Sequence, residues 1–271
     1  MAVYGLIADI HGNRAALDAA LALLDERGVD NIICLGDIVG YNAEPDACID
    51  TLQKRGIESI AGNHDLIAIR RLRSDRCANK VIYALHRTRR VLSKAGRDYL
   101  GSLPPDRVYE NDFALIHGGV DDVEYYMRNA SDIRLHAERF RRRFPGIGVC
   151  FFGHVHEQKV YEITGTGVTE LPETPPVLLR DRLYFVNPGS VDAARKSGER
   201  RAQCAVYDTG IRSIEFLDAA YDHAGSEARA TSGGYRIGPG MARVYSWRRR
   251  LKRWLARAER MAGWTTDASH R

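Results

Sequence analysis

Five short apolar segments of this 271-residue chain each end in a polar fragment of the metal-ligand type. The fragments are Asp9-Ile10-His11, Gly36-Asp37, Gly62-Asn63-His64-Asp65, His117-Gly118-Gly119 and Gly153-His154-Val155-His156. A short apolar run that ends in glycine or a polar residue is typical of a buried strand. Because open α/β sheets collect functional groups at the carboxyl ends of their strands, the pattern predicts an α/β fold with one polar site at that edge.

Two of these fragments have ligand-type residues two positions apart, Asp9 with His11 and His154 with His156. In an extended chain, residues i and i+2 point to the same side. The first pair is therefore expected to reach a common point, where Asp9 and His11 offer two ligands to one ion. Asp37 has two carboxylate oxygens and can bridge two ions.

The charge of the ligand set favours two divalent ions and an anionic substrate. Two such ions bring +4, Asp9 and Asp37 supply −2, and Asn63 and the histidines are neutral when bound. Two ions roughly 3.5–4 Å apart suit attack on phosphorus, because they lower the pKa of a bound water and stabilise charge on the phosphoryl oxygens. Taken singly, each fragment is also typical of a turn or a helix cap; their joint occurrence favours the two-metal interpretation.

The segments between and after the fragments predict helices and further strands. Asn13 is placed as the N-cap of a helix whose apolar stripe runs from Leu17 to Leu24 and which ends near Gly28. Residues 66–110 have helical patterns. Short apolar strands are expected at 160–163, 183–186, 205–207 and 213–217. The chain is thus expected to form two packed sheets flanked by helices.

Together, the five fragments resemble the signature of the calcineurin-like metallophosphoesterase superfamily: Asp-x-His, Gly-Asp, Gly-Asn-His-Asp/Glu, His and Gly-His-x-His. All five blocks occur in that order over residues 9–156, and Asn-Pro-Gly-Ser-Val at 187–191 extends the resemblance to about residue 208. Gly40-Tyr41 and Pro45-Asp46 resemble the small prokaryotic branch linked to phosphodiesterase and diadenosine tetraphosphatase-like activities. The resemblance implies an α/β fold, a four-layer α/β/β/α sandwich of two mixed sheets flanked by helices.

The resemblance also implies a role for each residue of the fragments. One ion would be held by Asp9, His11, Asp37 and His156, and the other by Asp37, Asn63, His117 and His154, with Asp37 as the bridge. His64 resembles the histidine that protonates or stabilises the leaving group, and Asp65 would orient it. Oxygen and imidazole ligands suit Mn²⁺, the first expectation, and also Fe²⁺, Zn²⁺ or Ni²⁺.

Three further residues are candidates for contact with the substrate. Where small members of the family have Gly-Gln-Pro-Arg after the Asn-Pro-Gly-Ser-Val block, this chain has Asp192-Ala193-Ala194-Arg195. The arginine is kept and the Gln-Pro is not, which leaves substrate positioning by Arg195 and Arg201 open. Tyr41 falls in a loop expected to ring the site, where it either stacks on a base or packs in the core.

The chain is predicted to contain a metallophosphoesterase domain over 1–221, a linker over 222–242 and a basic amphipathic tail helix over 243–271. Residues 243–260 contain eight Lys or Arg and one Glu, a net charge of +7, whereas the whole chain has a net charge of +5. The basicity therefore belongs to the tail. Its apolar face either packs on the domain or a second subunit, or joins the basic residues in binding nucleic acid or an anionic membrane surface.

Composition and missing motifs narrow the class of protein. The five cysteines are scattered and odd in number, which favours a reducing cytoplasm. No signal peptide and no stretch of roughly 20 apolar residues that would span a membrane is expected. A P-loop, a Gly-x-Gly-x-x-Gly motif and a His-Glu-x-x-His motif are absent from the sequence.

The sequence thus predicts a cytoplasmic dimetal phosphoesterase whose substrate is a phosphorylated small molecule or nucleotide. Phosphodiesters and nucleotide phosphoanhydrides are the first expectation, and phosphate monoesters are the second. A nuclease guided by the basic tail and a non-catalytic scaffold of the same fold stay open as alternatives, as does a homo-oligomer.

Overall fold

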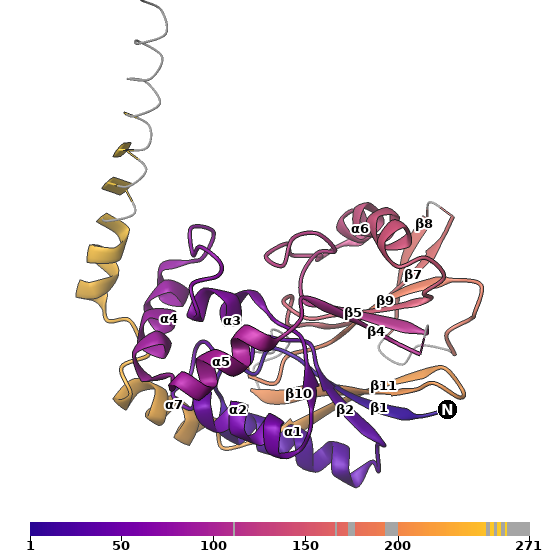
Figure 1. The fold of residues 1–271 in the computed structure, drawn as a ribbon, viewed down its shortest axis with the longest axis horizontal. Helices are drawn as coiled ribbons and strands as arrows, with labels where there is room; N and C mark the ends of the chain where they lie inside the picture. The colour runs from indigo at the N-terminus through magenta and orange to yellow at the C-terminus, as the bar shows by residue number, and fades with distance from the viewer. Residues whose placement is uncertain are drawn as a thin grey trace, which may run out of the picture.

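A computed structural model describes residues 1–110, 112–165, 167–172, 177–192 and 200–247, together with residues 250, 251, 254, 255 and 258. Arg195, a candidate for substrate contact, therefore lies outside the described residues. Within the described residues, two mixed sheets face each other and helices cover their outer sides (Figure 1).

The first sheet has five strands in the order β11-β10-β1-β2-β3. They are β1 (Val3–Ile7), β2 (Asn31–Cys34), β3 (Glu58–Ser59), β10 (Arg201–Asp208) and β11 (Ser213–Ala220). β1, β2 and β3 run parallel, so their carboxyl ends lie at one edge of the sheet. β10 pairs antiparallel with both β1 and β11.

The second sheet has six strands in the order β4-β5-β6-β9-β7-β8. They are β4 (Asp106–Tyr109), β5 (Phe113–Ile116), β6 (Val149–Phe152), β7 (Gln158–Thr164), β8 (Gly167–Leu171) and β9 (Leu183–Pro188). β5, β6 and β9 run parallel, so this sheet also gathers several carboxyl ends at one edge.

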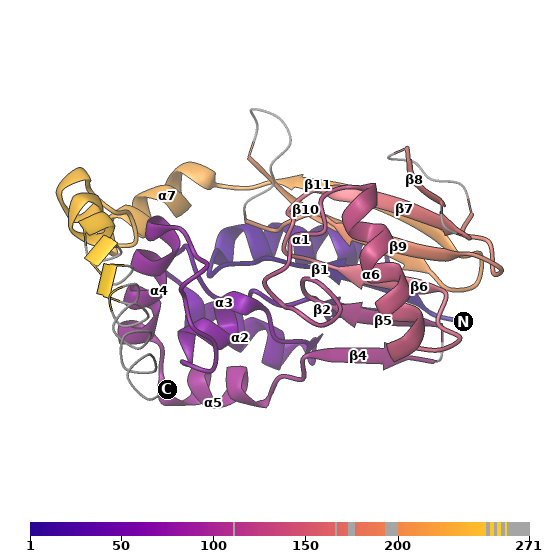
Figure 2. The same cartoon turned by 90° about the horizontal axis from the view of Figure 1, so that it is seen from above.

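Helices complete the outer layers (Figure 2). On the first sheet's side are α1 (Arg14–Glu26), α2 (Pro45–Lys54), α3 (Asn63–Ala68), α4 (Asn79–Val91) and α5 (Lys94–Ser102), whereas α6 (Ala130–Arg143) packs on β7 and β8. The side chain of Asn13 caps α1 as expected, by accepting from the backbone N–H of Ala16. The helix ends before Gly28, whose φ of 64° is left-handed and suits glycine.

Alternation along the strands divides the interior into three apolar layers. In β1, Leu6 lies between the sheets, whereas Ile7 packs among the helices of the first sheet. In β5, Leu115 lies between the sheets, whereas Ile116 belongs to the layer under α6. Because successive side chains of a strand point to opposite faces, each sheet is covered on both sides. The four-layer sandwich expected from the sequence is confirmed.

Residues 222–242, expected to be a linker, instead belong to the folded structure. They contain α7 (His223–Ser232), whose first turn is capped by the side chain of Asp222. The Ser226 hydroxyl donates to Asn13 Oδ1 at 3.0 Å, which ties α7 to the start of α1. Small and polar residues suggested a linker because they are common in loops, but they also cap helices and allow close packing.

The remaining sequence expectations concern cysteines and membrane segments. All five cysteines are free and buried. Among the described residues, no helix combines the length and apolar character needed to traverse a bilayer.

Candidate metal centre

The segments that follow β1, β2, β3, β5 and β6 come together just beyond the carboxyl ends of these strands. They carry all seven expected metal ligands, none of which has more than 5% of its surface exposed. These residues are Asp9, His11, Asp37, Asn63, His117, His154 and His156. Burying this many polar groups together is costly unless they are paired or bind a metal.

Five of the seven ligands have left-handed backbone conformations. Their φ angles are 56° at Asp9, 52° at His11, 55° at Asp37, 67° at His154 and 63° at His156. Such conformations are uncommon outside glycine, and each costs of order 1–3 kcal/mol. Their concentration in one cluster marks it as a functional site, because the fold holds a strained backbone where the side chains must converge.

The two residue pairs are not in the extended conformation expected from their spacing. The strands end before the ligands, so neither pair lies in extended chain. Asp9 and His11 still converge, through left-handed turns rather than strand pleating. His154 and His156 belong to different ligand groups, the division that the family resemblance implies.

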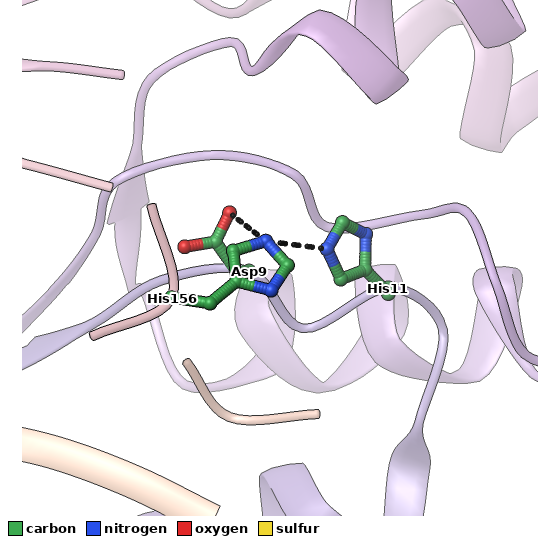
Figure 3. A group of neighbouring side chains, drawn as sticks. All are labelled: Asp9, His11 and His156. Atoms are coloured by element: carbon green, nitrogen blue, oxygen red, sulfur yellow. Dashed lines mark hydrogen bonds and ion pairs between the residues drawn. The ribbon is translucent and has the colours of Figure 1, made fainter. Parts of the chain in front are cut away.

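The first ligand group consists of Asp9, His11 and His156 (Figure 3). The Nε2 atom of His156 lies 3.3 Å from Asp9 Oδ1 and 3.3 Å from His11 Nε2. The three potential ligand atoms lie within 4.8 Å of one another, a spacing compatible with one ion.

A second group consists of Asp37, His117 and His154, again with ligand atoms within 4.8 Å of one another. Asn63 adjoins it, because its Oδ1 lies 3.2 Å from His117 Nε2. Asp37 faces both groups: Oδ1 is 3.4 Å from His117 Nε2 and Oδ2 is 4.0 Å from His11 Nε2. Among the described residues, Asp37 Oδ2 is also buried without a hydrogen-bond partner, as expected of an atom that binds a cation.

Backbone carbonyls select the nitrogen that two histidines would offer to a metal. Nδ1 of His117 lies 2.7 Å from the Leu35 carbonyl, and Nε2 of His154 lies 3.2 Å from the Glu124 carbonyl. A carbonyl only accepts, so each of these nitrogens carries the proton and the opposite nitrogen is left for a metal.

The charges of the cluster also suit metal binding. Burial and the neighbouring His64 ring hold the pKa of His11 well below its ordinary value, and burial does the same for His154, so both imidazoles are neutral. Burial alone would raise the pKa of Asp37, but the imidazoles of His117 and His64 outweigh it and keep the pKa low. At His117, burial is outweighed by Asp37, which raises the pKa to about 9, so a metal would displace a proton there.

His64 lies beside the ligands and within reach of both groups. Its backbone N–H donates to Asp37 Oδ1 at 2.8 Å, and its ring centroid is 4.6 Å from that of His11. It also forms a third compact group with His11 and Asp37, so the geometry leaves a ligand role for it open as well.

Asp65 does not orient His64 by a side-chain hydrogen bond in the described structure. Its carboxylate accepts from the backbone N–H groups of Gly62, at 3.0 Å, and Val39, at 3.1 Å. Burial and the nearby Asp37 carboxylate raise the pKa of Asp65 to about 7. Asp65 thus fixes the loops that carry Asp37 and His64.

The other substrate candidates have different surroundings. The Tyr41 ring meets His11 edge-on at 4.5 Å and His64 at 5.0 Å, so it borders the site. Arg201, at the start of β10, instead pairs with Asp218 on β11 and makes no described contact with the ligands. Arg201 was a candidate because it follows the Asn-Pro-Gly-Ser-Val block in the sequence. In the structure its partner is instead supplied by the neighbouring strand of the β10–β11 pair.

Contacts between separate loops also form at the rim of the site. The Tyr126 ring lies 3.9 Å from the His154 ring, and the Arg128 guanidinium lies 4.3 Å from the Tyr126 centroid. Arg76 pairs with Asp122 at 2.7 Å, which joins the loop before α4 to the loop before α6. These contacts link segments far apart in sequence, so periodicity and motifs do not reveal them.

The two-sheet fold and this ligand cluster define a metallophosphoesterase domain. The family model of the calcineurin-like phosphoesterase superfamily domain matches residues 1–210. The chain therefore belongs to the calcineurin-like phosphoesterase superfamily.

Individual relatives agree with this assignment. An uncharacterised protein of Methanocaldococcus jannaschii is 29% identical over 225 residues, 80% of this chain and 87% of that protein. The crystal structure of a metallophosphoesterase from Sphaerobacter thermophilus has a TM-score of 0.72 and 27% identity, over 90% of this chain and 98% of that chain. A hypothetical protein from Pyrococcus horikoshii OT3 has the same fold, with a TM-score of 0.68 and 19% identity over 90% and 98% of the two chains.

Proposed function

We propose that this protein is a dimetal-dependent phosphoesterase that hydrolyses phosphodiester or nucleotide phosphoanhydride bonds. The observation that carries the proposal is the position of Asp37, whose two oxygens face two separate ligand groups. Asp9, His11 and His156 would complete one ion's ligands, and Asn63, His117 and His154 the other's. When bound, the ions would lower the pKa of the attacking water and stabilise charge on the phosphoryl oxygens.

The chain's own residues supply the rest of the chemistry. His64 is the group placed to donate a proton to the departing oxygen, because its buried ring adjoins both ligand groups and its Nδ1 has no hydrogen-bond partner among the described residues. Tyr41 and Tyr126 border the ligands on different loops. Arg128 stacks on Tyr126 and adds positive charge at that rim.

The preference for diesters or anhydrides over monoesters rests on the resemblance of the Gly40-Tyr41 segment to the small prokaryotic branch. The test is a hydrolysis screen of the full-length protein after exhaustive chelation and reconstitution with Mn²⁺, Fe²⁺, Zn²⁺ or Ni²⁺. The substrates would be bis-p-nitrophenyl phosphate, p-nitrophenyl phosphate, dinucleoside polyphosphates and cyclic nucleotides.

We expect the chelated protein to be inactive and Mn²⁺ to restore hydrolysis of the diester or the polyphosphates. Full activity after verified removal of all metal would refute the metal mechanism. A clear preference for p-nitrophenyl phosphate would refute the substrate assignment but leave the mechanism intact.

A further inference from the structure

One side of the helix that begins at residue 239 contacts α4. The Tyr245 hydroxyl lies 2.8 Å from Nδ1 of His86, and Asn79 donates to Ser246 Oγ at 2.9 Å. His86 and Asn79 both belong to α4. Two residues along an α-helix correspond to a rotation of roughly 160° in the shorter direction, so Trp247 lies almost opposite Tyr245. The face that carries Trp247 therefore points away from α4.

That outward face is apolar and exposed. Trp247 is 62% exposed, Leu251 39%, Trp254 64% and Leu255 46%. All four are helical, and their spacing of three, four and seven residues places them on one face. No described part of the chain covers this Trp face, and an exposed apolar patch of this kind marks an interaction site.

The same segment holds the chain's surplus positive charge. Residues 243–260 have a net charge of +7 in a chain of net charge +5, so the remaining residues carry −2. Arg250, three residues after Trp247, is also helical. An apolar stripe with tryptophans in a strongly basic segment is the composition of helices that lie in a bilayer interface.

We propose that this helix binds the surface of an anionic lipid bilayer through its Trp face. A second copy of the chain fits less well, because an isologous contact would bring two +7 segments together. A nucleic-acid backbone would attract the charge, but it offers no apolar phase for Leu251 and Leu255. A bilayer with acidic headgroups satisfies both features, since its phosphates attract arginine and its acyl boundary accepts tryptophan and leucine.

All three tryptophans of the chain, at positions 247, 254 and 264, lie in the tail, so tryptophan fluorescence reports on the tail alone. The test adds phosphatidylcholine vesicles, with or without phosphatidylglycerol, to the full-length protein. Tryptophan emission and co-sedimentation are measured together. We expect a blue shift and binding with the anionic vesicles, and binding to neutral vesicles weaker by about tenfold or more.

Matched variants distinguish vesicle binding through the Trp face from nonspecific adsorption of the protein. Trp247→Ala/Trp254→Ala should weaken co-sedimentation by about tenfold or more, because the apolar contribution is lost. Ile211→Ala, at an apolar residue that is 63% exposed in the turn before β11, should change nothing. Vesicle binding that the tryptophan pair does not affect would overturn the proposal. So would binding to duplex DNA alone, or a dimer that light scattering shows to be lost in the tryptophan variant.

An independent observation concerns Arg236, which lies outside the family-matched residues 1–210. Its guanidinium donates to the Tyr41 carbonyl at 2.7 Å and to Asn42 Oδ1 at 3.1 Å. Glu227 of α7 fixes the same guanidinium by two hydrogen bonds of 2.7 Å. A forked guanidinium held in this way has little freedom to move.

The loop that Arg236 holds lies against the metal centre. The backbone N–H of Asn42 donates to the His11 carbonyl at 2.8 Å, and the Tyr41 ring contacts both His11 and His64. We infer that Arg236 is a positioning residue that keeps Tyr41 against His64. This second inference rests on the proposed phosphoesterase function.

The test compares Arg236→Ala, Tyr41→Ala and the double variant with the Mn²⁺-loaded wild type. Arg236→Ala should keep its metal content and lower kcat by about tenfold or more for substrates with poor leaving groups. The double variant should be no slower than Tyr41→Ala, since both changes remove one interaction. Arg200→Ala, which removes the exposed 3.5 Å pair with Glu227 but leaves Arg236 in place, is the matched control.

The outcomes distinguish this inference from the proposed function. An inactive wild type with bound metal would refute the function itself. An active wild type with additive effects of Arg236→Ala and Tyr41→Ala, an unchanged kcat, or loss of metal from Arg236→Ala would refute the positioning role alone.

Discussion

Gly62 stands where the structure leaves no room for a side chain. A Cβ atom at this position would lie 2.1 Å from Asp37 Oδ1 and 2.3 Å from the Asp37 backbone nitrogen, whereas ordinary contacts begin at 3.4 Å. The φ angle of Gly62 is −93°, which any residue adopts. Gly62→Ala is therefore a steric perturbation of Asp37, and relieving the contact requires a shift of about 1 Å.

The consequences follow from the position of Asp37 between the two ligand groups. Overpacking a buried site costs typically about 1–3 kcal/mol of unfolding free energy. A displacement of about 1 Å at reacting groups lowers the rate by about 10²-fold. Because Asp37 faces both groups, the affinity for both ions should fall together.

The assay combines denaturant unfolding, elemental analysis of bound metal and hydrolysis of bis-p-nitrophenyl phosphate. Gly238→Ala is the matched control, because a Cβ there would meet nothing within 4 Å. We expect the control to match the wild type. If Gly62→Ala also keeps wild-type metal content and rate, Asp37 does not occupy the bridging position and the argument fails.

Three further predictions use the same assays. Asp37→Asn should weaken both ions and Asp9→Asn chiefly one, so equal single-ion losses by elemental analysis would contradict the bridge. His64→Gln should keep both metals and lose roughly 10²–10⁴-fold in rate, less for p-nitrophenolate leaving groups than for alkoxides; loss of metal would instead make His64 a ligand. Deleting residues 243–271 should leave small-substrate hydrolysis largely intact, because all expected ligands lie between residues 9 and 156, and loss of activity from a folded truncation would show that the tail helps build the site.

Much of the fold was predictable because it depends on local patterns. The apolar runs ending in Gly-Asp or Gly-His predicted β2 and β6, and Asn13, as an N-cap residue, predicted the start of α1. The continuous apolar run of a strand such as β5 is enough to predict burial on both faces. The error at residues 222–242 has the same origin, because a polar, glycine-containing stretch has no local signal that distinguishes a loop from a capped helix that packs against α1.

The sequence by itself determined the inventory of the site, namely which residue types follow which strands and hence the chemistry they can support. Only the tertiary structure decided how they are arranged. It turned the backbone left-handed at five of the expected ligands, directed the Asp65 carboxylate to the backbone of Gly62 and Val39 rather than to His64, and brought Arg236 against the Tyr41 loop. The physical reason is that local sequence sets backbone preference and burial, whereas convergence in space depends on strand order, left-handed turns and long-range hydrogen bonds. Those are properties of the packed chain as a whole.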